Sequence, residues 1–99
     1  MKVSEFLTKD KWCREHHAVD ACGEPIAAKS EFAVRWCLLG VAEVCYNTGD
    51  IVCTPLHTKV LNIIQKRYPD RDYAGWSFFN DDPLVTFDDI MEVVREADL

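Results

Sequence analysis

The chain contains only four glycines, and none of them belongs to a glycine-rich loop. Phosphate-binding loops and dinucleotide fingerprints need several glycines at fixed spacing, so that the backbone can approach the phosphate groups closely. The sequence also lacks the Gly-x-Ser-x-Gly elbow of the α/β-hydrolases and the patterns of common nucleic-acid-binding modules. These absences argue against nucleotide-dependent catalysis, serine hydrolysis and direct nucleic-acid binding.

The sequence has no apolar run long enough for a transmembrane helix, and its first residues do not resemble a secretory signal. Residues 1–5 include Glu5 and are not followed by the apolar segment that a signal peptide requires. We therefore expect a cytoplasmic protein that does not insert into a membrane.

Cysteine occurs five times but never as a Cys-x-x-Cys pair. This odd number, together with the expected compartment, predicts free thiols. Five side chains near the N-terminus are of types that bind zinc: Cys13, His16, His17, Asp20 and Cys22. Their spacing is wrong for zinc, because adjacent histidines on a strand point to opposite faces. A nucleophile is also disfavoured, since Cys37 is in an apolar segment and Cys13 with His17 has no third group to orient them. We predict no catalytic residue, metal or cofactor.

Positive charge is scarce in the last fifth of the chain. The net charge of the whole chain is −6, and residues 81–99 alone hold seven acids and one arginine. Such a distribution does not provide the general positive field that attracts nucleic acid. A partner attracted by charge would have to be basic.

Residues 32–46 form an apolar segment that contains only two charges, Arg35 and Glu43. A helix that is apolar on every face has to be buried, so this segment, with Trp36 inside it, predicts a central helix. We expect it to begin near residues 30–31 and to end at residues 47–49. Glycine within a helix costs about 1 kcal/mol relative to alanine, so Gly40 is expected to let another backbone approach closely.

Capping signals and apolar spacing indicate the other elements. Thr54 and Pro55 predict the start of a helix whose apolar stripe runs from Leu56 to Tyr68. Thr86 and Asp89 resemble a capping box that opens a last helix. Its apolar stripe consists of Phe87, Ile90, Met91, Val94 and Ala97.

The remaining segments are shorter or less regular. Residues 3–10 predict a short first helix, residues 12–26 a small hairpin or extended element, and residues 51–53 an apolar linker. Residues 70–85 predict an irregular segment whose aromatic side chains, Tyr73, Trp76, Phe78 and Phe79, reach the core. We therefore predict a single compact domain, residues 1–99, of the α+β class but mostly helical. About four helices would surround one buried central helix, with a small N-terminal hairpin or extended element.

Three segments resemble a family of short, uncharacterised bacterial and phage proteins that is classed only as a domain of unknown function. The most specific is Ala33-Val34-Arg35-Trp36-Cys37-Leu38-Leu39-Gly40, which resembles the family's Trp-Cys-Leu-x-Gly core helix. Residues 18–25 are similar to an Ala-Arg-Asp-x-x-Gly-x-Pro segment, with Val19 in place of the arginine. Asn80-Asp81 is similar to a Trp-Asn-Asp motif, with Phe79 in place of the tryptophan. The resemblance covers roughly residues 6–97 and implies a compact, mainly helical domain with no known activity.

The charges of the central helix need partners or access to water, because an unpaired buried charge costs several kcal/mol. Arg35 is expected to pair with Asp20, Asp81 or Asp82 as a structural clamp, and anchoring a ligand is the second interpretation. The adjacent acids Asp81-Asp82 and Asp88-Asp89 are better explained by turn composition and by the helix dipole than by acid–base catalysis.

We expect a non-enzymatic interaction protein, encoded by a phage or mobile element, that binds a basic macromolecular partner, and we expect this partner to be a protein. The expected binding face is the acidic last helix, with Asp88, Asp89, Glu92 and Glu96. Only Arg95 would relieve the repulsion among these acids. The alternative is a small-molecule or metabolite-binding domain with a pocket near Arg35 and Asn80-Asp81.

Overall fold

The computed structural model describes residues 2–47 and 54–99. In chain order, the elements of these two ranges are α1 (Val3–Phe6), the 3₁₀ helix η1 (Lys9–Lys11), β1 (Ala18–Val19), β2 (Arg35–Trp36), α2 (Leu38–Tyr46), α3 (Pro55–Arg67), α4 (Trp76–Asp81) and α5 (Phe87–Glu96). The fold is mostly helical and α+β, as predicted. No helix within the described ranges is long and apolar enough to cross a membrane.

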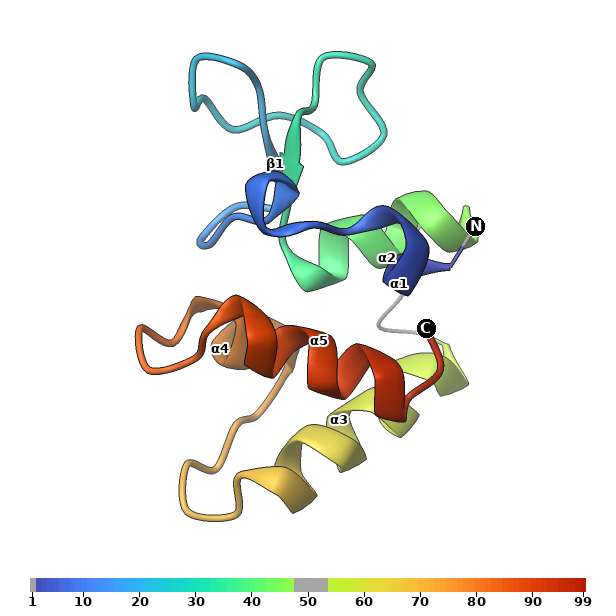
Figure 1. The fold of residues 1–99 in the computed structure, drawn as a ribbon, viewed down its shortest axis with the longest axis vertical. Helices are drawn as coiled ribbons and strands as arrows, with labels where there is room; N and C mark the ends of the chain where they lie inside the picture. The colour runs from blue at the N-terminus through green and yellow to red at the C-terminus, as the bar shows by residue number, and fades with distance from the viewer. Residues whose placement is uncertain (1, 48–53) are drawn as a thin grey trace.

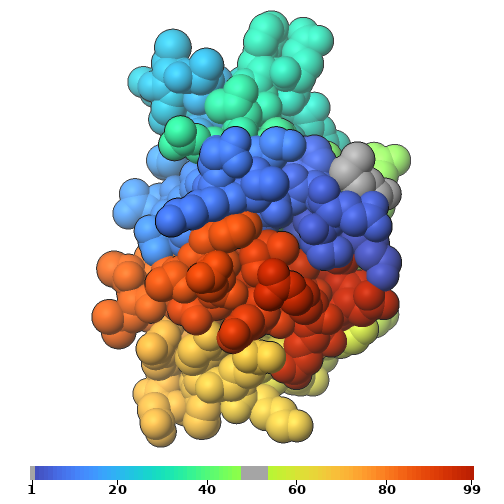
Figure 2. All heavy atoms as spheres, viewed as in Figure 1, coloured from blue at the N-terminus to red at the C-terminus, as the bar shows by residue number. Residues whose placement is uncertain are grey.

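The elements form two halves that pack directly on each other (Figures 1 and 2). One half contains α1, α2 and the small sheet, and the other contains α3, α4 and α5. Helix α2 packs on α1 and α4, while α5 packs on α1 and α3. The two ends of the chain meet, because the Ser4 amide donates to the Leu99 carbonyl at 3.0 Å. The N-terminal segment is therefore held between the central helix and the last one.

The central helix is shorter than predicted. Helix α2 begins at Leu38, and Cys37 is its N-cap, with Sγ accepting a hydrogen bond from the Gly40 amide at 3.3 Å. Residues 35–36 instead form β2, which pairs antiparallel with β1 in the register Ala18↔Trp36 and Val19↔Arg35. Backbone hydrogen bonds to a distant segment thus outweigh the local helical pattern.

The prediction that residues 32–46 are buried as one segment is also wrong. Phe32 is 67% exposed, and Val34 and Arg35 are exposed as well. Trp36 is buried as expected, but from a strand, and its Nε1 donates to the Ala28 carbonyl at 2.8 Å.

The predicted hairpin within residues 12–26 is only partly correct. Its first strand, β1, exists, but the strand that pairs with it is β2, which follows two projecting loops (Figure 1). Within residues 12–26, the chain pairs with β1 only through an isolated bridge between Val19 and Pro25. The turn between them is closed by Asp20, whose Oδ1 accepts from the amides of Cys22 and Glu24.

The helix-start signals are confirmed. The side chain of Thr54 caps α3, with Pro55 in the first helical position. At α5 the capping box is complete, since Thr86 and Asp89 each accept the other's backbone N–H. The predicted first helix is divided into α1 and η1. Asn47 ends α2 with a left-handed φ of 48°, whereas the predicted linker at residues 51–53 lies outside the described residues.

The core contains the side chains that the helical stripes predict. Val60 and Ile64 of α3 are buried, as are Ile90, Met91 and Val94 of α5. Phe87, at the start of the α5 stripe, is half-buried and packs against the core. The aromatic side chains of Tyr73, Trp76 and Phe79 are buried as expected, but Phe78 is 65% exposed.

Gly40 allows a close backbone approach, as predicted. A Cβ atom at this position would overlap with the carbonyl oxygen of His17. That carbonyl accepts a hydrogen bond from the Cys37 amide at 3.2 Å, so it is held against the first turn of α2. The glycine therefore fixes the distance between α2 and the segment that leads into β1.

We predict that Gly40→Ala destabilises the protein by about 1–3 kcal/mol, although alanine is ordinarily the better helix former. The reason is that the two backbones would have to separate. Chemical denaturation monitored by circular dichroism measures this change. Gly75→Ala is the matched control, because a Cβ there meets only the Phe78 side chain at 3.8 Å. Equal stability of the two variants would contradict this account.

Candidate functional site

Asn80 lies in the core and not at the surface, with a side chain that is 1% exposed. Its Oδ1 accepts hydrogen bonds from Nε1 of Trp12 at 2.7 Å and from the Leu38 amide at 3.0 Å. Its Nδ2 donates to the Cys13 carbonyl and to Oδ1 of Asp81, both at 3.0 Å. An asparagine side chain offers two donor hydrogens and one acceptor oxygen with two lone pairs, and all of this capacity is used here. Asn80 is therefore a structural residue, and its predicted role in binding a ligand is not supported.

Asp81 lies next to Asn80 but at the edge of the core. Its Oδ1 accepts from Nδ2 of Asn80 and from the Glu15 amide at 2.7 Å. Glu15 has a left-handed φ of 73°, which a non-glycine residue seldom adopts, so this hydrogen bond helps to hold the loop after Cys13. Asp81 also lines a surface pocket.

Arg35 does not take part in the hydrogen bonds of Asn80 and Asp81. It lies exposed on β2, and its predicted partners are engaged elsewhere: Asp20 closes its own turn, Asp81 binds Glu15 and Asp82 binds Tyr73. No ion pair joins Arg35 to these acids in the described ranges, so the predicted clamp is wrong. The error follows from the strand, because Arg35 on β2 faces water and needs no partner. Glu43 is half-buried, with Oε1 4.0 Å from Nδ1 of His17.

The acids of α5 have internal partners that the sequence did not reveal. Arg67 at the end of α3 contacts two of them, with Nη1 3.2 Å from Oε2 of Glu92 and Nε 2.7 Å from Oε1 of Glu96. Asp89 is engaged in the capping box. The expectation that only Arg95 offsets these charges is therefore wrong, and Asp88 is the one predicted site acid on this helix without such a contact in the described residues.

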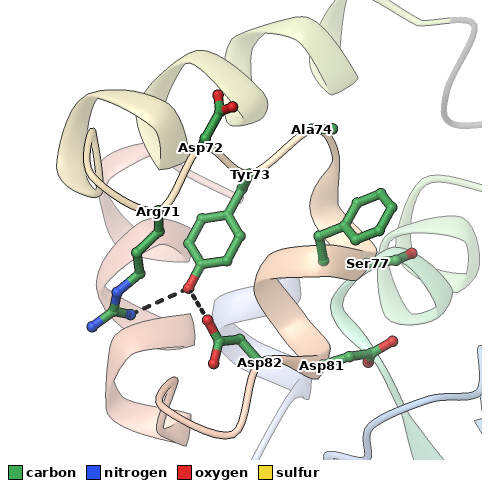
Figure 3. Close-up of a pocket in the computed structure, with 8 residues that line it drawn as sticks. Arg71, Asp72, Tyr73, Ala74, Ser77, Asp81 and Asp82 are labelled. Atoms are coloured by element: carbon green, nitrogen blue, oxygen red, sulfur yellow. Dashed lines mark hydrogen bonds between the residues drawn. The ribbon is translucent and has the colours of Figure 1, made fainter.

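A pocket of about 580 Å³ lies beside α4 (Figure 3). Its lining comes from the α3–α4 loop and from the outer face of α4: Arg71, Asp72, Tyr73, Ala74, Ser77, Phe78, Asp81 and Asp82. Three of these residues are acidic and one is basic, so the pocket carries a net negative charge. It is larger than the pockets beside Trp12 and beside Arg67, which are about 400 and 410 Å³.

Tyr73 is the centre of the polar network in this pocket (Figure 3). Its hydroxyl donates to Oδ2 of Asp82 at 2.5 Å and accepts from Nη1 of Arg71 at 3.2 Å. The hydrogen bond from Tyr73 lowers the pKa of Asp82, with a further contribution from the Leu84 amide. Burial raises the pKa of Tyr73, and its hydrogen bond to Asp82 raises it further. At neutral pH the pair is therefore a carboxylate and a neutral phenol.

Most of this pocket was missed because residues 70–85 were predicted to be irregular. Residues 76–81 form α4, in which Trp76, Phe79 and Asn80 share the buried face. The spacing i, i+3, i+4 of these three residues is the signal that could have identified the helix. On such a helix, Ser77, Phe78 and Asp81 fall on the outer face, where they line the pocket.

The four cysteines that the structure describes are free thiols. None of Cys13, Cys22, Cys37 and Cys45 is in a disulfide, while Cys53 lies outside the described residues. Burial raises the pKa of Cys37 to about 11, which keeps its thiol protonated at neutral pH. Within the described ranges, no three His, Cys, Asp or Glu side chains are close enough to hold a metal ion.

The family model of a family of unknown function, DUF6197, matches residues 1–98. The chain belongs to this family. No curated protein and no solved structure shows significant similarity to it. Membership in DUF6197 assigns no activity, so the chemistry of the site has to be inferred from its geometry.

We predict that Asn80→Asp destabilises this DUF6197 protein by at least about 3 kcal/mol. The substitution preserves the shape of the side chain but removes both donor hydrogens and places a buried negative charge beside Asp81. Urea denaturation measures the loss. Asn62→Asp, on the exposed side of α3, makes the same chemical change and is expected to cost less than about 0.5 kcal/mol. A cost for Asn80→Asp no larger than that of this control would refute the structural role of Asn80.

Proposed function

We propose that this protein is a non-enzymatic, cytoplasmic interaction protein that binds a partner protein through a basic surface of that partner. The observation that carries the proposal is the pocket beside α4, an open cavity lined by three carboxylates and an exposed phenyl ring. The proposal includes no direct contact with nucleic acid and no insertion into a membrane.

The distribution of unpaired carboxylates favours the pocket over α5 as the primary contact surface. On α5, the contacts with Arg67 neutralise part of the charge of Glu92 and Glu96. Among the residues that line the pocket, Arg71 is the one cation beside Asp72, Asp81 and Asp82, and Arg14 acts on Asp82 from outside the lining. The acids of α5 remain part of the proposal as a source of long-range attraction, which increases association rates and is screened by salt.

The electrostatics of the pocket support a binding role over a catalytic one. A general acid or base works best with a pKa near the operating pH. The pKa of Asp82 is lowered and that of Tyr73 is raised, so the two groups most closely linked by a hydrogen bond are both moved away from neutrality. Such a pair keeps a fixed charge, which suits recognition of a cation.

A second candidate function is the binding of a small molecule. The volume of about 580 Å³ falls within the range of roughly 300–1,000 Å³ that is typical of ligand pockets. Asp81 lines this pocket, as the alternative expected, whereas Arg35 does not, and Asn80 lies beneath it in the core. The carboxylates would select a cationic metabolite.

An inhibitory role for a protein encoded by a phage or mobile element would suit a small acidic binding domain. The basic surface of a host protein would then be the target. Genomic neighbourhood tests this part of the proposal, because phage or defence genes beside the coding sequence would support it and a conserved metabolic operon would oppose it.

We predict that the protein binds a fluorescein-labelled peptide of alternating Arg and Leu residues, and a Lys-Leu counterpart, but not a Glu-Leu counterpart. Fluorescence anisotropy measures the affinities, and stopped-flow mixing measures the association rates. The association rate should fall by at least about tenfold as the ionic strength rises from low values to about 0.15 M, because attraction between opposite charges is screened. Equal binding of the acidic and basic peptides, or none of either, would contradict the proposed function.

A further inference from the structure

We propose that the pocket beside α4 holds one lysine or arginine side chain of the partner protein. The aliphatic part of that side chain would pack on Phe78, and its charged end would be held by Asp81, with Asp72 adding negative charge from the other end of the lining (Figure 3). This inference rests on the proposed function and assigns its recognition site.

The walls of the pocket provide an apolar surface that is already in place. The ring of Tyr73 is buried and fixed by edge contacts with Phe79 and Tyr68, at centroid distances of 5.6 and 6.0 Å. Phe78 faces the other way from Phe79 on the same helix and is 65% exposed. The Tyr73 ring, held by these contacts, needs no rearrangement when a ligand enters, which reduces the entropic cost of binding.

The carboxylates around this apolar surface determine which occupant fits. Asp82 is engaged on both oxygens, because Oδ1 accepts from the Leu84 amide at 2.9 Å and Oδ2 accepts from Tyr73. Both hydrogen bonds of Asp81 use Oδ1, which leaves Oδ2 available. Asp72 makes no hydrogen bond or ion pair with any residue that the structure describes. Two carboxylates beside an aromatic ring complement a cationic side chain with an apolar stem.

Arg71 shows that the surface accommodates a guanidinium group. Its Nη1 donates to the Tyr73 hydroxyl, and its Cζ lies 4.9 Å from the centroid of the Tyr68 ring. Figure 3 shows Arg71 on one side of Tyr73, with Ser77 and Asp81 on the other. An incoming cation would be repelled by Arg71 and would therefore bind on the side of Phe78 and Asp81.

A neighbouring apolar side chain favours a protein partner over a free amine. Leu84 is 70% exposed, and its amide is bound by Asp82 of the pocket. Residues that flank the basic side chain of a partner could cover both Leu84 and Phe78. A small amine would satisfy the carboxylates but would leave these apolar groups in water, which is unfavourable by comparison.

Two double variants test the assignment with the Arg-Leu peptide as the probe. Asp72→Asn with Asp81→Asn removes two charges from the pocket, while the new amide oxygen at position 81 can still accept from the Glu15 amide. Glu92→Gln with Glu96→Gln removes two charges from α5 and is the matched control for net charge. We expect the pocket variant to weaken binding by at least about tenfold and the α5 variant by less than about threefold.

Three further measurements distinguish a local contact from a general field. Phe78→Ala should weaken binding by about threefold through the lost cation–π and apolar contact. Replacing the arginines of the peptide by citrulline, a neutral isostere, should abolish binding to the unmodified protein. Asp72→Asn alone, at a side chain with no contact to disturb, should weaken binding by about threefold while leaving the melting temperature unchanged.

Each alternative outcome has a defined meaning. Loss of binding in the α5 variant with normal binding in the pocket variant would overturn this inference and leave the proposed function intact. Competition by free argininamide as effective as that by the peptide would replace the protein partner with a small cation and overturn the inference. Failure of the unmodified protein to bind either basic peptide would refute the proposed function itself.

Discussion

The amide of Asn80 holds together segments that are far apart in the sequence. Its oxygen receives hydrogen bonds from the Trp12 indole and from the first amide of α2, while its nitrogen donates to the Cys13 carbonyl and to Asp81. A buried polar group with every hydrogen bond satisfied specifies one arrangement, whereas the loss of any partner leaves an unsatisfied group in the core. The two halves of the molecule therefore have a defined position relative to each other.

The position of the pocket depends on the same side chain. Asn80 faces the core from α4, and residues on the opposite face of this short helix line the cavity. Asp81 connects the two, because its carboxylate binds both Asn80 and the Glu15 amide. A substitution at Asn80 would therefore displace the pocket residues on the opposite face, because both lie on the same helix of six residues. This arrangement explains how short elements can hold a preformed pocket at the surface.

Local signals in the sequence were sufficient for part of the fold. The caps at Thr54 and Thr86, the apolar stripe of α5 and the close approach at Gly40 all depend on residue types at short spacing, and the structure confirms them. The strand at residues 35–36 could not be predicted in this way, because its hydrogen bonds are made to residues 17–19. An apolar pattern that suits a buried helix also suits a buried strand when a partner is present.

The candidate site was less accessible to sequence analysis for the same reason. The pairing of Arg67 with Glu92 and Glu96 depends on how α3 and α5 pack, which their separate sequences do not reveal. From the sequence alone, the acidic face of α5 was therefore predicted to have fewer basic partners than the structure shows. The sequence analysis named Asn80 and Asp81 together, and only the structure distinguishes the buried amide from the carboxylate beside it that lines the pocket.

The most direct test of the proposed binding surface is nuclear magnetic resonance with ¹⁵N-labelled protein titrated with the Arg-Leu peptide. If the pocket is the contact surface, the largest changes in amide chemical shift will occur at Ala74, Ser77 and Phe78. The Trp12 indole signal will stay in place because its hydrogen bond to Asn80 is internal. Changes concentrated at Glu92 and Glu96, with none around Phe78, would contradict this account.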